Sequence, residues 1–211
     1  MKALPFVFVL LFAFASLAAD APSNAIYAND FERAPTDKIP EELMVMSGTF
    51  VVKEEGGNKF LELPGAPLDT FGLLFGPPAQ TGVAAGARFF GTKQGRKFPT
   101  FGVSLNGVAG YRLQMSPAKK ALEIYKGDEP KASVPFEWQS GAWTSLRIRI
   151  RATDNGWIVE GKAWLYEAVE PQKWAIAFPT KEEPPPGRAG IWGSPYAGTP
   201  IQFDDLVMTK E

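Results

Sequence analysis

The sequence predicts an all-β protein in which two antiparallel sheets pack as a sandwich. Short runs of alternating apolar and polar residues dominate the chain, and this period of two is typical of strands with one buried face. The 21 glycines and 19 prolines separate these runs, as turn residues do in sandwiches. No amphipathic helical run of useful length follows the apolar N-terminal segment, although Thr36–Leu43 is expected to hold a helical turn.

The same pattern places the strands in chain order. Aromatic and β-branched residues fill them, and glycine, proline or charged turn residues bound them. The predicted strands are Ile26–Phe31, Gly48–Lys53, Phe60–Leu63, Gly72–Phe75, Val83–Phe90, Phe101–Leu105, Tyr111–Met115, Leu122–Tyr125, Trp143–Arg151, Trp157–Tyr166, Trp174–Phe178, Ala189–Trp192 and Ile201–Met208.

One hairpin can be predicted residue by residue, because Asn155-Gly156 is a strong two-residue turn signal. With that dipeptide as the turn, Arg151 opposes Glu160 and Arg149 opposes Lys162. One face of the hairpin is then wholly apolar and carries Leu146, Ile148, Ile150, Gly161, Ala163 and Leu165. A slip of one residue would mix the two faces, so the pattern favours this assignment.

The opposite face of this hairpin is rich in cations and aromatic rings, and two interpretations stay open. It is either a solvated outer face, relieved by a carboxylate from a third strand, or a groove for an acidic polysaccharide. In the groove, arginine pairs with sugar carboxylates and the rings stack. The candidate binding residues on this face are Arg147, Arg149, Lys162, Trp164 and Tyr166, and the loop "WGSPYAG" adds Trp192 and Tyr196.

The first residues have the pattern of a secretory signal peptide. Lys2 precedes an apolar run, and small residues end it near Ala19. The run is shorter than the ~20 residues that a membrane span needs. We therefore expect residues 1–19 to be removed, residues 20–211 to form a single domain, and the product to be secreted or periplasmic, with no membrane partner after cleavage.

Composition narrows the function. The net charge of −1 gives no reason to expect nucleic acid as a partner. The chain has no cysteine and no histidine, which excludes disulfides, Ser-His-Asp and Cys-His catalysis, and ordinary catalytic zinc sites. Any catalysis would use carboxylate, Tyr, Lys or Arg groups, and any bound metal would be a hard cation that prefers oxygen ligands.

Several segments together resemble a known superfamily. In order, they are "YAND" with "FE", "GTFVVKEEGGNKFLEL", "YRLQM" with "LEIYK", "WQSGAWTSLRIRIR" and "GRAGIWGSPYAGTPIQFDDLVM". This arrangement resembles the concanavalin A-like lectin/glucanase jelly rolls of secreted bacterial proteins, including laminin-G-like domains and those grouped with 3-keto-glycoside hydrolases. The resemblance covers nearly all of residues 20–211 and implies a jelly-roll sandwich, but it does not specify a function.

The resemblance also bears on the adjacent acids Asp204 and Asp205, which a regular strand would direct to opposite faces. In such jelly rolls the first and last strands often lie side by side, and acids from both can hold a structural calcium ion. Here the resemblance implies Asn29, Asp30 or Glu32 near Asp204 or Asp205. The alternative is that one aspartate faces solvent and the other pairs with an arginine, such as Arg188.

Two functions follow from the resemblance, and a purely structural role stays open beside them. One is a secreted carbohydrate-binding or surface module, with a polysaccharide as partner and no catalytic residue. The other is a glycoside-active enzyme, a hydrolase or polysaccharide lyase, for which Glu62, Glu123 and Glu137 are candidates by residue type alone. The Glu-x-Asp-x-x-Glu spacing of family-16 glucanases and the histidine of several alginate-lyase relatives are both missing, so we favour binding over catalysis.

Overall fold

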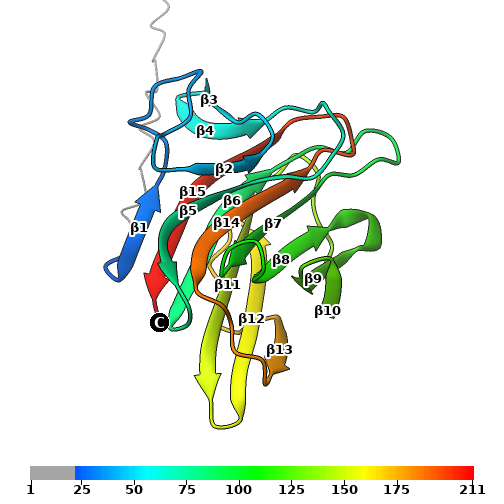
Figure 1. The fold of residues 1–211 in the computed structure, drawn as a ribbon. Helices are drawn as coiled ribbons and strands as arrows, with labels where there is room; N and C mark the ends of the chain where they lie inside the picture. The colour runs from blue at the N-terminus through cyan, green and yellow to red at the C-terminus, as the bar shows by residue number, and fades with distance from the viewer. Residues whose placement is uncertain (1–21) are drawn as a thin grey trace, which may run out of the picture.

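The computed structural model describes residues 22–211 as a sandwich of two antiparallel sheets (Figure 1). The predicted all-β, two-sheet fold is therefore confirmed. The predicted signal peptide, residues 1–19, lies outside the described residues. Among residues 22–211, no helix has the length and apolar character that a membrane span requires.

The first sheet has eight strands, and the last strand along the chain pairs with three others. The order is β13-β12-β11-β6-β15-β4-β3, and β1 also pairs with β15. Figure 1 shows β15 in red between β1 and β6. The strands of this sheet are β1 (Ala25–Asn29), β3 (Val51–Glu55), β4 (Asn58–Leu63), β6 (Val83–Phe90), β11 (Thr144–Thr153), β12 (Gly156–Leu165), β13 (Ile176–Thr180) and β15 (Ile201–Lys210).

The second sheet has seven strands in the order β10-β9-β8-β7-β14-β5-β2. The run from β7 to β10 is a meander in which each strand pairs with the next along the chain. The strands are β2 (Met44–Ser47), β5 (Phe71–Ala79), β7 (Thr100–Leu105), β8 (Tyr111–Ser116), β9 (Ala121–Lys126), β10 (Glu129–Pro135) and β14 (Gly187–Ser194). A short 3-10 helix, Pro117–Lys119, joins β8 to β9.

The core lies between the two sheets and is filled by alternate residues of their strands. Leu146, Ile148 and Ile150 of β11 are fully buried in it, as are Leu113 and Met115 of β8. The residues between them point to the outside of the sandwich. Where a strand alternates in this way without a bulge, its outward residues can be identified from the sequence once the inner residues are known.

The prediction missed two strands. β2 and β10 were not predicted, because β2 is an exposed edge strand without alternation and β10 contains two prolines. No helix forms in Thr36–Leu43, but a single hydrogen-bonded turn is present at its end, where the Leu43 N–H donates to the Pro40 carbonyl at 3.1 Å. At the start of the segment, Asp37 donates to the Val52 carbonyl and Val52 donates to the Lys38 carbonyl.

The predicted register of the β11–β12 hairpin is wrong by two residues, while its faces are largely confirmed. The turn is Asp154-Asn155, and Arg149 opposes Glu160 instead of Lys162. A two-residue shift keeps each side chain on its face. The hairpin still has one cross-strand ion pair, now Arg149 with Glu160, and one like-charged pair, now Arg147 with Lys162, and Glu170 contacts both of those cations. Leu165 is the exception on the apolar face, because it is 41% exposed near the end of β12.

The conformation of Gly156 explains why the two-residue turn is Asp154-Asn155 and not the predicted Asn155-Gly156. The φ of Gly156 is +132°, and a Cβ atom there would lie 2.5 Å from the Thr180 carbonyl oxygen of β13.

We expect Gly156→Ala to lower the free energy of unfolding by about 1–3 kcal/mol, because the new side chain meets both backbone strain and a steric clash. Urea unfolding measures this. Gly56→Ala is the control, since Gly56 also has positive φ (+61°) but open space around it; equal losses in both variants would contradict the steric explanation.

Candidate functional site

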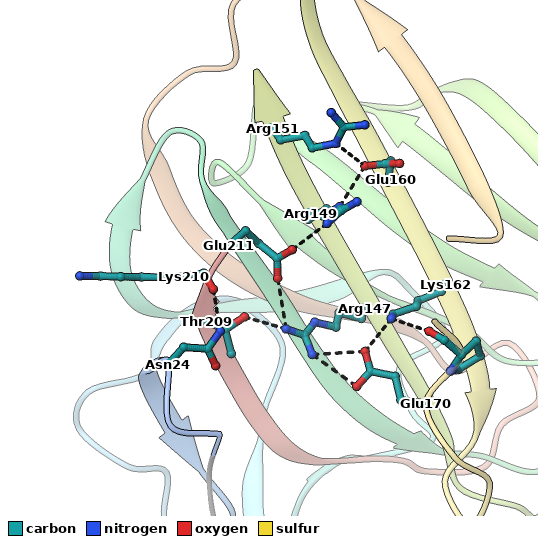
Figure 2. Close-up of polar contacts among 11 residues, drawn as sticks. Asn24, Arg147, Arg149, Arg151, Glu160, Lys162, Glu170, Thr209, Lys210 and Glu211 are labelled. Atoms are coloured by element: carbon teal, nitrogen blue, oxygen red, sulfur yellow. Dashed lines mark hydrogen bonds and ion pairs between the residues drawn. The ribbon is translucent and has the colours of Figure 1, made fainter. Parts of the chain in front are cut away.

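The cations predicted to bind an acidic glycan lie on the outer face of the eight-stranded sheet, and the protein's own carboxylates already contact them (Figure 2). Arg147 pairs with Glu170 at 3.2 Å and with Glu211 at 3.3 Å, and it also donates to the Thr209 hydroxyl. Arg149 pairs with Glu160 and Glu211, each at 2.9 Å. The carboxylates thus come from β12, the loop after it and the residue following β15.

Lys162 completes this cluster, which we call the Arg147 network, with Arg147, Arg149, Arg151, Lys162, Glu160, Glu170 and Glu211 as its members. Lys162 is only 6% exposed. Its ammonium group contacts Glu170 at 2.8 Å and donates to the Pro171 carbonyl at 2.7 Å. Arg149 and Lys162 also lie over the Trp174 ring, at 4.3 and 4.6 Å from its centroid. A sugar carboxylate would therefore have to compete with carboxylates that are already in place.

The two aromatic residues predicted beside these cations differ in role. Trp164 is partly buried, with the Lys162 ammonium group 5.9 Å from its ring centroid. Tyr166 stacks instead on Arg88 of β6, whose guanidinium lies 4.3 Å from the ring centroid. Tyr166 therefore belongs to a second cluster, which includes the two aspartates of β15.

Arg88 is the centre of that second cluster. It pairs with Asp204 at 2.6 Å, and Asn58 bonds both groups, donating to Asp204 and accepting from Arg88. Asp204 is fully buried. Burial raises the pKa of Asp204 to about 7, and the charge of Arg88 opposes that shift. The Trp143 ring also contacts the guanidinium, and the distance from its centroid to the Arg88 Cζ atom is 4.7 Å. Aspartate carboxylates and aromatic rings therefore surround Arg88.

A β-bulge explains why both aspartates can face Arg88. Asp204 pairs with Arg88, but the next pair is Val207 with Gly86, so β15 contains one more residue than β6 over this stretch. Asp205 has a φ of +49° and lies 3.0 Å from the Arg88 Nε atom, off the N–H axis. The alternative prediction is that one aspartate faces solvent and the other pairs with an arginine. Asp204 does pair with an arginine, but the arginine is Arg88 and not Arg188, and the partly exposed Asp205 also lies beside it.

The predicted calcium ligands are only partly brought together. β1 pairs with β15, as the resemblance implied, and Asp30 and Asp205 line one cleft of about 750 Å³. However, Asp204 is turned toward Arg88, and the Glu32 carboxylate accepts a hydrogen bond from the Lys59 backbone. Among residues 22–211, no group of three or more acidic, histidine or cysteine side chains could hold a metal ion. These residues do not fit a calcium ion, because a guanidinium stands between the two aspartates.

The outer face of the seven-stranded sheet offers a different arrangement, centred on Trp192 of β14. Its cross-strand neighbours are Gly72 of β5 and Gly102 of β7, so the ring has no side chain beside it on either strand. A Cβ atom on Gly72 would lie 2.2 Å from Cε3 of the ring. On the other side, the indole Nε1 donates to the Ser104 hydroxyl at 2.8 Å. The ring therefore lies down across the sheet.

Polar residues of β8 and β9 continue this face. Glu123 is buried there, and it accepts hydrogen bonds from Ser116 (2.6 Å), Tyr125 (3.1 Å) and Lys119 (3.1 Å). Burial alone would raise the pKa of the Glu123 carboxyl, but these hydrogen bonds lower it below its ordinary value. The Glu123 carboxylate thus favours its ionised form and accepts hydrogen bonds from its neighbours. It is therefore unsuited to donate a proton as a catalytic acid.

Arg112 of β8 lies on the same face, between Ser104 and Tyr125 in the cross-strand register. Its guanidinium is 5.2 Å from the centroid of the Tyr125 ring. Its Nε atom is buried and has no hydrogen-bond partner among residues 22–211. Burial lowers the pKa of Arg112, and Asp128 is the acid that most opposes this shift.

The structure separates the predicted binding residues between the two faces. Trp192 lies on the seven-stranded sheet, and Tyr196 is 48% exposed on the loop after β14, with its hydroxyl 3.5 Å from Thr70. Arg112, Gln114 and Tyr125 were missed. The alternation that identified the polar face of the β11–β12 hairpin is equally present in "YRLQM" and "LEIYK", and it would have placed them on one outer face.

The candidate acids for catalysis do not form a pair. Glu62 lies on the eight-stranded sheet and Glu123 on the seven-stranded sheet, and both point outward from opposite sides of the sandwich. Glu137 is exposed and pairs with Lys120 at 3.1 Å. Two carboxylates that flank one glycosidic bond must lie within roughly 10 Å of each other, and these do not share a face.

Comparison with known proteins supports the fold. No family model matches the chain, and no curated protein matches it in sequence. Solved structures do match: the carbohydrate binding module CBM66 from Bacillus subtilis has 11% identity, a TM-score of 0.55, and coverage of 80% of this chain and 96% of that one. Lectin II from Ulex europaeus has 12% identity, a TM-score of 0.54, and coverage of 88% and 98%.

A third match is the carbohydrate recognition domain of Emp46p in its metal-free form, with 13% identity, a TM-score of 0.57, and coverage of 88% of this chain and 94% of that one. The same domain also matches in a potassium-bound form. At these identities the likeness concerns the fold alone. Together with the two antiparallel sheets, it confirms the concanavalin A-like jelly roll that the sequence resemblance implied.

We expect Arg88→Met to lower the free energy of unfolding by about 3–5 kcal/mol, because it leaves Asp204 buried without its counter-charge. The loss should be smaller at pH 5 than at pH 8. The raised pKa means that protonated Asp204 favours the folded state, and this contribution disappears as the pH rises through about 7. Urea unfolding at both pH values measures the effect. Arg96→Gln, in an exposed loop, is the control; a loss no larger than in that control would refute the role of Arg88.

We also expect the thermal unfolding midpoint to be the same with a chelator and with added calcium, because Arg88 supplies the positive charge between Asp204 and Asp205. Differential scanning calorimetry with EDTA or millimolar calcium checks this. A rise of several degrees with calcium, abolished in Asp204→Asn, would restore the calcium site.

Proposed function

We propose that this concanavalin A-like sandwich is a carbohydrate-binding module, and that it binds a polysaccharide on the outer face of the seven-stranded sheet. The observation that carries the proposal is the Trp192 ring, which lies flat over Gly72 and beside Gly102. The fold is shared with a carbohydrate binding module and a carbohydrate recognition domain, which supports it.

The face has the composition that a sugar needs. A pyranose has apolar C–H faces and a polar rim of hydroxyls, so its site combines an aromatic surface with a few placed polar groups. The hydrogen bond to Ser104 fixes the plane of the Trp192 ring. Gln114 lies directly opposite Gly102, in the same cross-strand row as Trp192, and is partly exposed. Its amide donates to the Ser116 hydroxyl at 3.0 Å, which leaves the amide oxygen as an acceptor for a hydroxyl of the same ligand.

The predictions of export, of an enzymatic alternative and of an acidic ligand come from the sequence. Secretion or periplasmic export would follow from the signal peptide predicted at residues 1–19. A glycoside-active enzyme is the alternative, but the named carboxylates lie apart. An acidic polysaccharide remains the predicted ligand; the Arg147 network gives it weak support, because Glu160, Glu170 and Glu211 already neutralise its cations.

The proposal is tested by binding to a polysaccharide array, followed by calorimetric titration of the best oligosaccharide. Trp192→Ala should weaken binding by roughly 30-fold, equivalent to about 2 kcal/mol for a central aromatic contact. Gly72→Ala should also weaken it, because a methyl group there would lift the ring from the sheet. This second variant keeps the indole and tests its position.

Trp164→Ala is the matched control on the opposite face. Full binding by this variant, together with loss in Trp192→Ala, supports the seven-stranded face. The reverse result would move the site to the Arg147 network. Binding that neither substitution changes, or no binding to any polysaccharide of the array by the unmutated protein, would overturn the proposal.

A further inference from the structure

Within residues 22–211, Arg112 differs from the other arginines on the strands because it has neither an ion-pair nor a hydrogen-bond partner. Arg88, Arg147, Arg149 and Arg151 each form an ion pair with a carboxylate at 3.2 Å or less. Arg188 of β14 also forms no ion pair in the described part of the chain, but it donates to the Glu42 carbonyl at 3.4 Å. Within residues 22–211, Arg112 forms no ion pair, and its buried Nε atom lacks a hydrogen-bond partner. A partly buried guanidinium without an acceptor is costly, and such groups are rare in folded proteins.

The fold holds this guanidinium in place without neutralising it. Arg112 leans over its neighbouring strand, where its Cγ atom is 3.2 Å from the position a Cβ atom on Gly102 would occupy. The Tyr125 ring supports the guanidinium from the β9 side. Gly102 is also the cross-strand neighbour of Trp192. Because glycine has no side chain, none at this position separates the Arg112 guanidinium from the Trp192 indole.

The nearest polar cluster does not compete for Arg112. Glu123 lies on the same face, but its carboxylate is occupied by Ser116, Lys119 and Tyr125. Asp128, in the turn between β9 and β10, contributes only a longer-range charge. The surface beside Trp192 therefore presents a positive group whose hydrogen-bond donors point to no acceptor of the described chain.

We propose that Arg112 is an anion subsite, which binds the oxyanion of a charged sugar, a carboxylate or a sulfate ester, next to the ring stacked on Trp192. This inference rests on the proposed function and names its ligand class. A guanidinium can hold such a group through two parallel hydrogen bonds, which adds both affinity and orientation. The acidic polysaccharide would then be recognised on the face opposite to the Arg147 network.

The test compares each anionic oligosaccharide with its neutral form on the unmutated protein. Oligogalacturonate with its methyl ester probes the carboxylate, and a sulfated galactan with its desulfated form probes the sulfate ester. We expect the anionic form of one pair to bind roughly 10- to 100-fold more tightly, the range for hydrogen bonds to a charged group. Arg112→Gln should remove this preference, and Arg112→Lys should retain part of it.

Arg96→Gln is the matched control, because Arg96 is exposed on a loop and its loss changes the net charge equally. It should keep the full preference. The melting temperature of Arg112→Gln should be unchanged or higher, since among residues 22–211 Arg112 has no ion pair or hydrogen bond to lose and its only aromatic contact is with Tyr125, whereas a structural arginine would show a loss. Equal binding of both forms in every pair, or a preference that survives in Arg112→Gln, would overturn the anion subsite. Neutral sugars would in that case still bind through Trp192, whereas the proposed function itself fails if no polysaccharide binds or if binding is independent of Trp192.

Discussion

The ion pair between Arg88 and Asp204 is the interaction on which the eight-stranded sheet depends. It joins β6 to β15, and Asn58 of β4 bonds to both partners. A buried ion pair contributes little net stability compared with apolar packing, but a buried acid left alone is strongly destabilising. The pair therefore acts mainly as a constraint on geometry: only the register in which Arg88 faces Asp204 leaves neither charge buried and unpaired.

That register in turn determines how β15 contributes to the core. In a regular strand, Phe203 and Leu206 would point to opposite sides of the sheet. The extra residue at Asp205 restores the alternation after the acidic pair, so that Phe203, Leu206 and Met208 all lie in the core. The bulge thus allows both aspartates to reach Arg88 without removing an apolar side chain from the interior, which is a recognised use of β-bulges.

The alternation of side chains was predictable from sequence, whereas the contacts between distant segments were not. Ile148 and Ile150 were assigned correctly because their strand alternates without interruption, and the two-residue error in register left that assignment intact. The error itself came from Gly156, whose conformation depends on the approach of Thr180. The pairing of Arg88 with Asp204 joins segments 116 positions apart, and no local pattern indicates it. Arg112 was missed for another reason, since an arginine on an alternating strand looks solvated until its surroundings are known.

The two outer faces show how a shared fold can carry different functions. The core residues specify the sandwich, and they constrain the outward side chains only through size and register, which is why structures with 11–13% identity can share this architecture. On the eight-stranded sheet the outward charges satisfy one another. On the seven-stranded sheet, Gly72 and Gly102 lack the side chains that would cover Trp192, and Arg112 lacks a partner. An aromatic ring that neighbouring strands leave uncovered and, among the described residues, an arginine without an ion-pair or hydrogen-bond partner thus lie on the same sheet face, and this is the physical reason to place ligand recognition there.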